Sequence, residues 1–447
     1  MYTREQVKAI TTKLLDMAGG DAEVEFSGGE RSGTRFANST ITTNLIQHDQ
    51  QVSVTVHQGS KQGTATTRDF SDEGLKLIAN EANKRAAAAR ELPNAPALLG
   101  PQEYIPVDAA LPGGVNFGPL ERAKMVKTCI DICEAKGVLG AGYIPKIDQT
   151  SCTANSKGLF AYYRVAEASF ILTCRTPDGT GSGWAGTTGI KDPSTIDAAA
   201  ITNIAADKAL KSRKAVALEP GRYTVILEPR ANARFLSLLT GIFNARAAES
   251  GRNFLSKPGG ATKVGEKAFS DLFTLRSDVG NPVLRQTTML GDNKPAAPVT
   301  WVEKGVVKNL LYDEAYARQK NVPPTPASTN MSLVMEGSNQ SVEDIIKSTR
   351  RGLLVTFFWY IRGVDPDTLL NTGMTRDGLF LIENGEITRP VQNFRWNMSP
   401  LVGYNNLTAV GRPVPMHMGE SYDGQGTALI PPVRMEDFYM TSVSPAV

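Results

Sequence analysis

Histidine and cysteine are scarce in this chain of 447 residues. The histidines are His48, His57 and His417, and no two of them have the spacing H-E-x-x-H or H-x-x-x-H. No histidine lies between residues 58 and 416. With so few imidazole groups, the sequence offers no basis for a Ser-His-Asp or Cys-His catalytic arrangement.

The cysteines, Cys129, Cys133, Cys152 and Cys174, all precede residue 175. Cys129 and Cys133 lie in "MVKTCIDICEA" and are spaced by one turn of a helix. A C-x₃-C pair could contribute to a metal site, but it is a weak signal by itself. Buried free thiols are the commoner explanation, and we favour them here.

Strong net charge and long apolar runs are also missing. The 48 basic and 45 acidic residues give a formal charge of +3, too small to indicate a nucleic-acid partner. No run of about 18 apolar residues predicts a membrane span. The N-terminus has scattered charges and no apolar segment typical of a signal peptide. We therefore expect a cytoplasmic protein with no nucleic-acid and no membrane partner.

The first half of the sequence contains helical and strand-like patterns in turn. A helix is predicted over Thr3–Ala18, short antiparallel strands over Asp21–Asp69, and a helix from Ser71 to about Arg90. Residues 93–114 are rich in proline and glycine and predict a strap over the surface.

A second unit of the same kind follows the strap. Helices are predicted over Leu120–Lys136 and Thr195–Ser212, with strands between 140 and 185. The order of elements suggests a loose duplication of residues 1–92 and 115–215.

From about residue 216 strands and loops dominate, apart from a core helix predicted near 228–250. We expect an α+β fold, because strands and helices do not alternate as βαβ units. Residues 1–215 would form an α+β domain with antiparallel sheets. Residues 216–447 would form a strand-rich domain with mixed or antiparallel sheets.

One C-terminal segment has strong turn chemistry. "TRDGLFLIENGEITRPVQNFRWNMSP" (375–400) places Asn384-Gly385 between strand-forming runs. A type I′ turn needs positive φ at both central residues, so Gly378–Ile387 predicts a tight hairpin. Thr-Arg-Asp-Gly (375–378) is expected to be an exposed approach to that hairpin.

Polar residues around this hairpin are candidates for binding a peptide or a partner. An anion or peptide-carboxylate site is one interpretation, because arginine suits carboxylate recognition. The other is structural, with the arginines tying strand ends together through an aspartate and backbone carbonyls. No catalytic and no metal-binding residue is predicted. The candidates are Arg350, Arg362, Arg376, Asp377, Asn393 and Arg395.

The segment 351–400, "RGLLVTFFWYIRGVDPDTLLNTGMTRDGLFLIENGEITRPVQNFRWNMSP", resembles the C-terminal signature of the TldD/PmbA family. This family is also labelled "modulator of DNA gyrase" and is classed among the metallopeptidases. "WVEKGVVKNLLYDEAYARQ" (301–319) and "LEPGRYTVILEP" (218–229) support the resemblance, which extends over about 216–435.

In the TldD branch a helical H-E-x-x-x-H motif and a late cysteine bind zinc. The histidine positions fall near Leu236 and Gly241 here, and the glutamate near Ser237. With no histidine between 58 and 416 and no cysteine after 174, this zinc site cannot be assembled. The chain is therefore similar to the TldE/PmbA branch, whose members pair with a TldD-type subunit.

The resemblance implies a non-catalytic subunit of a heterodimeric zinc peptidase that processes unfolded or leader-bearing peptides. Zinc would belong to a TldD-like partner, and this chain would hold no cofactor and be inactive alone. Its hairpin would form a wall of the peptide chamber or the partner interface. The alternative is a self-standing peptide-binding or peptide-maturation protein. Without its partner, the chain could form a homodimer.

Overall fold

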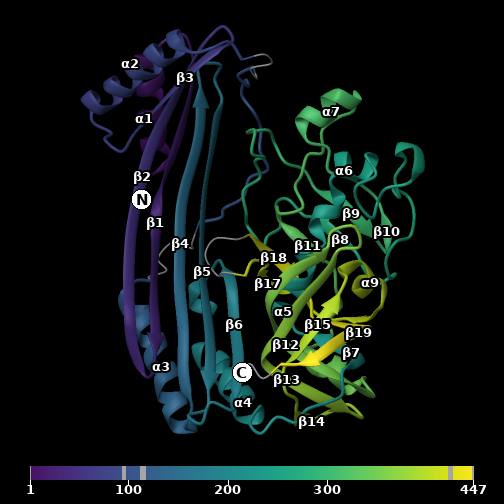
Figure 1. Cartoon of the computed structure of the whole chain (residues 1–447). Helices are drawn as coiled ribbons and strands as arrows, with labels where there is room; N and C mark the ends of the chain where they lie inside the picture. The colour runs from purple at the N-terminus through teal and green to yellow at the C-terminus, as the bar shows by residue number, and fades with distance from the viewer. Residues whose placement is uncertain (1, 93–96, 111–116, 421–425, 445–447) are drawn as a thin grey trace.

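The structure is a computed structural model that describes residues 2–92, 97–110, 117–420 and 426–444. Its N-terminal half is built on an antiparallel sheet with the strand order β3-β2-β1-β4-β5-β6 (Figure 1). The strands are β1 (Asp21–Ala37), β2 (Thr40–Gln58), β3 (Lys61–Thr67), β4 (Leu139–Asn155), β5 (Phe160–Arg175) and β6 (Ser182–Ile190). The strands β1 and β4 pair over their length at the centre of the sheet, from Glu23–Asn155 to Ala37–Ala141.

Helices cover one face of this sheet. They are α1 (Arg4–Ala18), α2 (Asp72–Ala88), α3 (Pro119–Lys136) and α4 (Ala198–Lys211), with a 3₁₀ turn η1 (Pro193–Thr195) before α4. The pairs α1/α2 and α3/α4 bury apolar residues from the same face of the strands. The opposite face of β5 and β6 contributes Ile171 and Trp184 to the core of the C-terminal half.

Local sequence signals account for these elements. Thr3 and Gln6 form the capping box of α1, Gly19 ends the helix with φ 64°, and Ser71 caps α2. The predicted helices are confirmed. The strands differ, because residues 21–69 form two long strands, β1 and β2, and the shorter β3 in place of four short ones.

The second unit, in contrast, contains one strand more than its pattern indicates. Residues Ser182–Ile190 form β6 although the segment is rich in glycine. A Cβ atom at Gly183 would lie 2.4 Å from the Ala205 carbonyl oxygen, so glycine permits α4 to pack closely on β6. All four cysteines are buried free thiols, as favoured from the sequence.

The described part of the strap, residues 97–110, contains no helix or strand. Its Ala109 carbonyl accepts a 2.8 Å hydrogen bond from the Ala166 N–H on β5. Its Ile105 carbonyl accepts a 2.9 Å bond from the Thr288 hydroxyl, so the strap joins β5 to the C-terminal half. The remaining strap residues lie outside the described part of the chain.

The C-terminal half contains two further sheets. One has the order β10-β9-β8-β11-β18-β17, and the other pairs β12, β7, β19, β15 and β13 in succession. Because β13 also pairs with β12, these five strands form a closed ring. Parallel pairs β11–β18 and β7–β12 occur among antiparallel ones, which confirms a mixed, strand-rich α+β architecture.

The strands of the first sheet are β8 (Leu275–Ser277), β9 (Val299–Glu303), β10 (Val306–Val307), β11 (Leu333–Met335), β17 (Val414–His417) and β18 (Thr427–Ile430). The strands of the second are β7 (Gly221–Leu227), β12 (Arg351–Asp365), β13 (Leu370–Glu383), β14 (Glu386–Pro390), β15 (Phe394–Met398), β16 (Leu407–Val410) and β19 (Val433–Val443). The helical segments are α5 (Pro229–Leu236), η2 (Thr240–Phe243), α6 (Ala245–Glu249), η3 (Pro258–Gly260), α7 (Glu314–Lys320), α8 (Val342–Lys347) and α9 (Pro400–Asn405).

The core helix expected near 228–250 is broken into α5, η2 and α6. Asn244 separates the last two and caps α6, its side chain accepting from the Ala247 N–H at 2.8 Å. The segment is buried as expected, and Phe235 of α5 is fully buried against aromatic rings from the strand ring.

The predicted hairpin is confirmed. Asn384 and Gly385 have φ values of 52° and 83°, and Glu383 pairs with Glu386 across the turn. The expected exposure of its approach is wrong, because Thr375 and Asp377 have exposed fractions of only 2% and 5%. Both residues lie within β13, which packs against β6.

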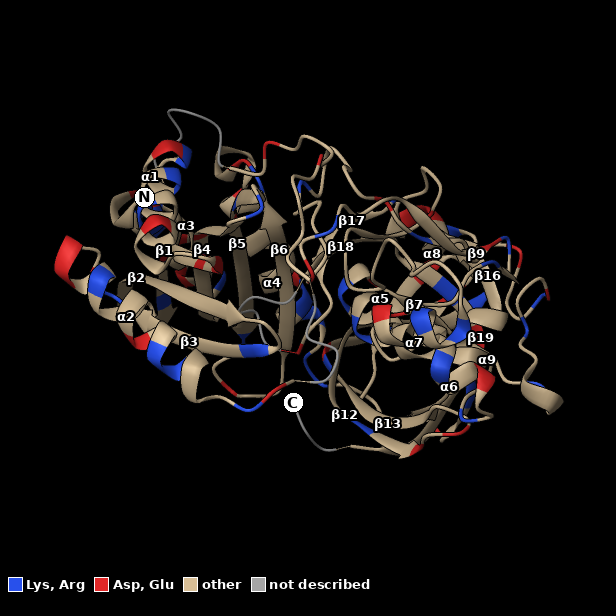
Figure 2. Cartoon of the chain, turned by 90° about the horizontal axis from the view of Figure 1, so that it is seen from above, with Lys and Arg blue, Asp and Glu red and all other residues tan. Residues whose placement is uncertain are grey.

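Charge is distributed evenly over the fold. Figure 2 shows Lys and Arg intermixed with Asp and Glu on both halves of the chain. None of the helices in the described part of the chain combines the length and apolar character needed to cross a lipid bilayer.

Candidate functional site

The six candidate residues chosen from the sequence do not gather at one point. Asp377 and Asn393 line the same cavity of about 350 Å³, between the start of β6, the strand β13 and the segment that joins β14 to β15. The Ser182 hydroxyl donates to Asp377 Oδ1 at 2.5 Å, and the Thr375 hydroxyl donates to Asn393 Oδ1 at 3.0 Å. Asp377 thus joins the N-terminal sheet to the C-terminal half.

The candidate arginines are spread along the strands. Arg376 lies over the Trp359 ring at 5.1 Å, with Nε 3.5 Å from Asp377 Oδ2. Arg362 is exposed and lies 4.3 Å from the Tyr360 ring centroid. Arg350 and Arg395 also lie in the C-terminal half. Arg350 is exposed, and its backbone carbonyl accepts a 2.6 Å hydrogen bond from the Asn384 N–H. Arg395 contacts Met374.

The positions near which the resemblance places the zinc motif carry no metal-binding side chains. Leu236 is fully buried in the core, Ser237 donates to the Arg234 carbonyl, and Gly241 lies in η2. Within the described residues, no three His, Cys, Asp or Glu side chains are grouped to hold a metal ion. The residues present therefore do not fit the zinc site of the TldD branch.

Two buried arginines occupy α5 instead. The Arg230 guanidinium donates to the carbonyls of His417 at 2.6 Å and Gly419 at 2.8 Å. Arg234 donates to the Met418 carbonyl at 3.1 Å. Together they hold the chain that follows β17 against α5. The available signal was a pair of arginines spaced i, i+4 in a short helix, and sequence reasoning missed it.

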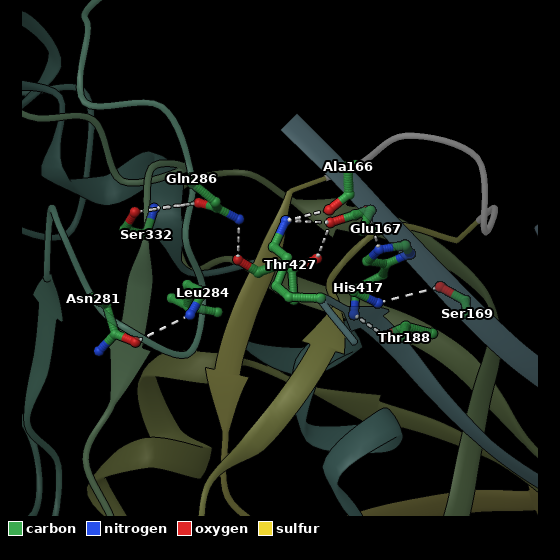
Figure 3. Close-up of polar contacts among 12 residues, drawn as sticks. Ala166, Glu167, Ser169, Thr188, Asn281, Leu284, Gln286, Ser332, His417 and Thr427 are labelled. Carbon is green, nitrogen blue, oxygen red and sulfur yellow. Dashed lines mark hydrogen bonds and ion pairs between the residues drawn. The ribbon is translucent and has the colours of Figure 1, made fainter. Parts of the chain in front are cut away.

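A buried charged cluster lies where β5 and β6 meet β17 and β18 (Figure 3). Glu167 Oε1 lies 3.1 Å from His417 Nε2, and Glu167 Oε2 lies 3.4 Å from Lys191 Nζ. The Thr427 hydroxyl donates to the same carboxylate at 3.3 Å. The side chains of His417 and Lys191 are only 2% and 5% exposed.

The surroundings determine the protonation of this cluster. Burial alone would raise the pKa of Glu167, but the His417 hydrogen bond and the Lys191 charge outweigh it and lower the pKa to about 2. Burial also lowers the pKa of Lys191, and the Glu167 carboxylate opposes that effect. The cluster therefore joins the two halves of the chain through an ionised carboxylate.

A groove of about 720 Å³ begins beside this cluster and runs between β5, the strap and residues 286–289. Its lining includes Tyr104, Phe160, Tyr162, Arg164 and Gln286. The Phe160 and Tyr162 rings are stacked with centroids 6.2 Å apart.

One edge of β5 opens onto this groove. The strand β6 pairs with β5 only from Ala168 onward, whereas β4 pairs with β5 from Phe160. The Ala166 N–H points away from β4 to the strap, so alternation directs the backbone groups of Tyr162 and Arg164 into the groove. An extended chain could pair with these groups, which makes the groove the candidate binding site.

Sequence reasoning predicted β5 as a strand but not its open edge. The edge exists because β6 ends opposite Ala168, and the spacing of apolar residues in β5 does not report where a neighbouring strand ends. Arg164 in the groove is already held, with two hydrogen bonds of 2.7 and 2.6 Å to Asp148.

Comparison with protein families gives two matches. The PmbA/TldA metallopeptidase C-terminal domain matches residues 220–442, and the PmbA/TldA metallopeptidase domain 1 matches residues 22–86. Among curated protein sequences, none matches the chain.

Solved structures share the fold. A Thermotoga maritima protein described as a modulator of a DNA gyrase is 17% identical, with a TM-score of 0.81 over 97% of this chain and 99% of that one. TldE from Thermococcus kodakarensis is 18% identical, with a TM-score of 0.80 over 98% of this chain and 100% of its own. A Bacteroides thetaiotaomicron protein described as a modulator of DNA gyrase is 18% identical, with a TM-score of 0.77 over 99% and 100%.

At sequence identities of 17–18% the solved structures establish only the fold. The family assignment rests on the two family domains that match the sequence. Both family domains match in order, and the shared fold extends over nearly the whole chain. The chain belongs to the TldD/PmbA family.

Proposed function

We propose that this chain is a non-catalytic, TldE-like subunit of a heterodimeric zinc peptidase that processes unfolded or leader-bearing peptides. The observation that carries the proposal is a TldD/PmbA fold with no histidine between 58 and 416 and no cysteine after 174, in which the zinc motif would fall near Leu236, Ser237 and Gly241. None of these side chains is a zinc ligand, so metal and cleavage would belong to a TldD-like partner.

The groove along β5 supports a peptide as the molecule that is bound. Backbone groups of β5 offer hydrogen bonds to any extended chain, whatever its sequence. Aromatic residues beside them, among them Tyr104 and Tyr162, add apolar contact area for side chains. Most strands of a folded protein are already paired or covered, whereas an unfolded segment has its backbone groups free, so the groove favours unfolded segments.

A self-standing peptide-binding or peptide-maturation protein is the second candidate. It is favoured by one observation: residues of this chain suffice to form a groove of about 720 Å³ along the open edge of β5. On this alternative the chain would bind peptide without any zinc-bearing subunit, and its partner would be dispensable for its activity.

The test compares the chain purified alone with the chain co-expressed with a TldD-like subunit. Elemental analysis and cleavage of an unstructured peptide are measured for both preparations. We expect no stoichiometric zinc and no cleavage from the chain alone, and chelator-sensitive cleavage from the pair. One zinc per chain with chelator-sensitive cleavage in the chain alone would overturn the proposal.

Binding of the same fluorescent peptide separates the two candidates. Peptide binding by the chain alone, together with failure to co-purify with any zinc-bearing subunit, favours the self-standing protein. Co-purification and cleavage that depends on both chains favours the peptidase subunit.

A further inference from the structure

Two basic side chains of α1 lie over the aromatic residues at one end of the groove along β5. The Arg4 guanidinium carbon lies 5.1 Å from the centroid of the Phe160 ring and 5.3 Å from that of the Tyr162 ring. The Lys8 ammonium, one helical turn further along α1, lies 6.0 Å from the Phe160 ring. Arg4, Phe160 and Tyr162 all line the groove. We call Arg4 and Lys8 the α1 cation pair.

The helix and the strand bring these side chains together for local reasons. Residues four apart lie on the same face of a helix, so Arg4 and Lys8 point the same way. Val7 on the adjoining face is buried against the sheet, which holds the helix in place. Phe160 and Tyr162 are two apart in β5 and point to one face of the sheet, with their rings within 7° of parallel. The cations are therefore positioned beside the open edge.

The α1 cation pair is exposed and forms no ion pair with a carboxylate of the described residues. Arg164 in the same groove differs, because two hydrogen bonds of 2.7 and 2.6 Å join its guanidinium to Asp148. A guanidinium that is held against aromatic rings keeps its N–H donors for a planar anion. Arg4 is therefore a positioned cation whose donors remain available to a ligand.

The open edge of β5 is short and is closed at its far end. The Ala166 N–H donates to the Ala109 carbonyl at 2.8 Å, and the Ala166 carbonyl accepts from Lys191 Nζ at 3.3 Å. Both outward groups of Ala166 are therefore occupied. By alternation, the remaining outward groups belong to Phe160, Tyr162 and Arg164. An added strand would cover residues 160–164 and reach the α1 cation pair at the other end.

The charge of the groove changes sign along β5. The α1 cation pair lies at the Phe160 end, whereas Asp108 of the strap lines the groove beside Ala109, at the Ala166 end. A strand added antiparallel to β5 has its carboxyl end at Phe160 and its amino end at Ala166. The charges favour this direction, because it places negative charge at Arg4 and positive charge near Asp108.

We propose that the α1 cation pair is a carboxylate-binding subsite of the groove, which selects peptides that place a carboxylate beside Phe160. The carboxylate belongs to the peptide C-terminus or to an acidic side chain, since both present the same two oxygens. Arg4 supplies paired N–H donors to these oxygens, and Lys8 adds a second positive charge. The proposal rests on the proposed binding of peptides in the groove and adds the class of peptide that is bound.

The experiment measures binding of three peptides to the full-length chain by fluorescence anisotropy. Each is an unstructured hexapeptide of alanine, serine and valine with a dansyl label, which has no negative charge, on its N-terminus. The first ends in a free carboxylate, the second in a carboxamide, and the third in a carboxamide with glutamate as its last residue. At least one of the carboxylate-bearing peptides should bind about tenfold more tightly than the second peptide. Which of them does so identifies the source of the carboxylate.

Variants of α1 test which residue makes the selection. Arg4→Gln should reduce the tenfold preference to less than about threefold and leave affinity for the carboxamide peptide unchanged. Arg4→Lys keeps the charge without the planar donors and should retain part of the preference. The matched control Lys13→Gln removes a cation of the same helix that pairs with Asp72 and is not among the groove-lining residues. This control should retain the full preference.

A purely structural role for Arg4 predicts a different result. If Arg4 only covers Phe160 and Tyr162, Arg4→Gln should lower the melting temperature and weaken binding of all three peptides equally. That result would overturn the proposal. Equal binding of the three peptides by the wild-type chain would also overturn it.

The proposed function is decided by separate readouts. Equal binding of the three peptides would remove carboxylate selection and leave peptide binding in the groove intact. Failure of every peptide to bind would contradict the carboxylate subsite, whereas zinc content and cleavage by the pair would still decide the proposed function.

Discussion

The two halves of the molecule differ in how their strands end. In the N-terminal sheet, β2 extends past β3 and β5 extends past β6, so each leaves part of an edge open. In the C-terminal half, β12, β7, β19, β15 and β13 pair in a ring, and each has a neighbour on both sides. Open edges offer backbone groups to other chains, whereas a ring offers none. The groove that we propose for peptide binding runs along one of these open edges, that of β5.

The largest expected effect compares one phenylalanine from each half. Phe235→Ala should cost about 3–5 kcal/mol of unfolding free energy, because the fully buried ring packs against Trp396 and Phe438 within the strand ring. Phe26→Ala should cost at least about 1 kcal/mol less, since its aromatic neighbours Tyr2 and Phe70 are half-buried and can relax into the cavity. Denaturant unfolding of both variants measures the difference. Equal losses would mean that closure of the ring adds no rigidity.

The next effect concerns β14, which lies outside the ring. Replacing Asn384-Gly385 by Val-Val should cost about 1–2 kcal/mol per residue, because valine resists the φ values of 52° and 83°. A Cβ atom at position 385 would also lie 2.6 Å from the Lys347 carbonyl oxygen. Thermal melting is the measurement. A melting temperature equal to wild type would show that the turn does not constrain the fold.

A smaller effect tests the contact between the halves. The pKa of Glu167 is lowered from 4.5 to about 2, so its contribution is complete above about pH 4.5 and is lost as pH falls toward 2. Glu167→Gln should therefore be less stable than wild type by on the order of 2–3 kcal/mol near pH 6. The gap should close progressively below pH 4.5. A gap independent of pH would contradict an ionised carboxylate at this position.

The smallest effects concern the arginines near the hairpin. Arg376→Ala removes a charge beside Asp377 and should lower stability by up to about 1 kcal/mol. Arg395→Ala should leave melting unchanged, because Arg395 is half-buried beside Met374 and the contact joining them is a weak one to sulfur, 4.0 Å long. If Arg395 faces the peptide or the partner subunit, cleavage by the reconstituted pair should fall in this variant. Wild-type cleavage and melting in both variants would remove this segment from the site.

The features that could be predicted from the sequence are those determined by neighbouring residues. Asn384-Gly385 requires a specific turn, and Thr3 with Gln6 starts a helix whatever lies elsewhere in the fold. The α+β class follows from the spacing of apolar residues. Each of these signals depends only on residues within a few positions of one another in the chain.

The candidate site depended on distant parts of the chain and could not be predicted. The burial of Asp377 depends on Ser182, almost two hundred positions away, and the open edge of β5 depends on where β6 ends. The absence of zinc ligands near Leu236 and Gly241 could be predicted from the sequence, because it depends only on which side chains contain metal-binding atoms. The groove could not, because its walls come from the strap, β5 and residues 286–289.

The central pairing of β1 with β4 has a consequence for biosynthesis. The partner of Glu23 is Asn155, so the middle of the N-terminal sheet cannot close until the second helix–strand unit has left the ribosome. Until then the emerging chain displays β1 with one side bare, and pairs of such distant residues form slowly. A truncation after α2 would retain α1, the first three strands and α2 but lack this partner. The nascent N-terminal unit is therefore a stage at which an unpaired strand edge is exposed to other chains.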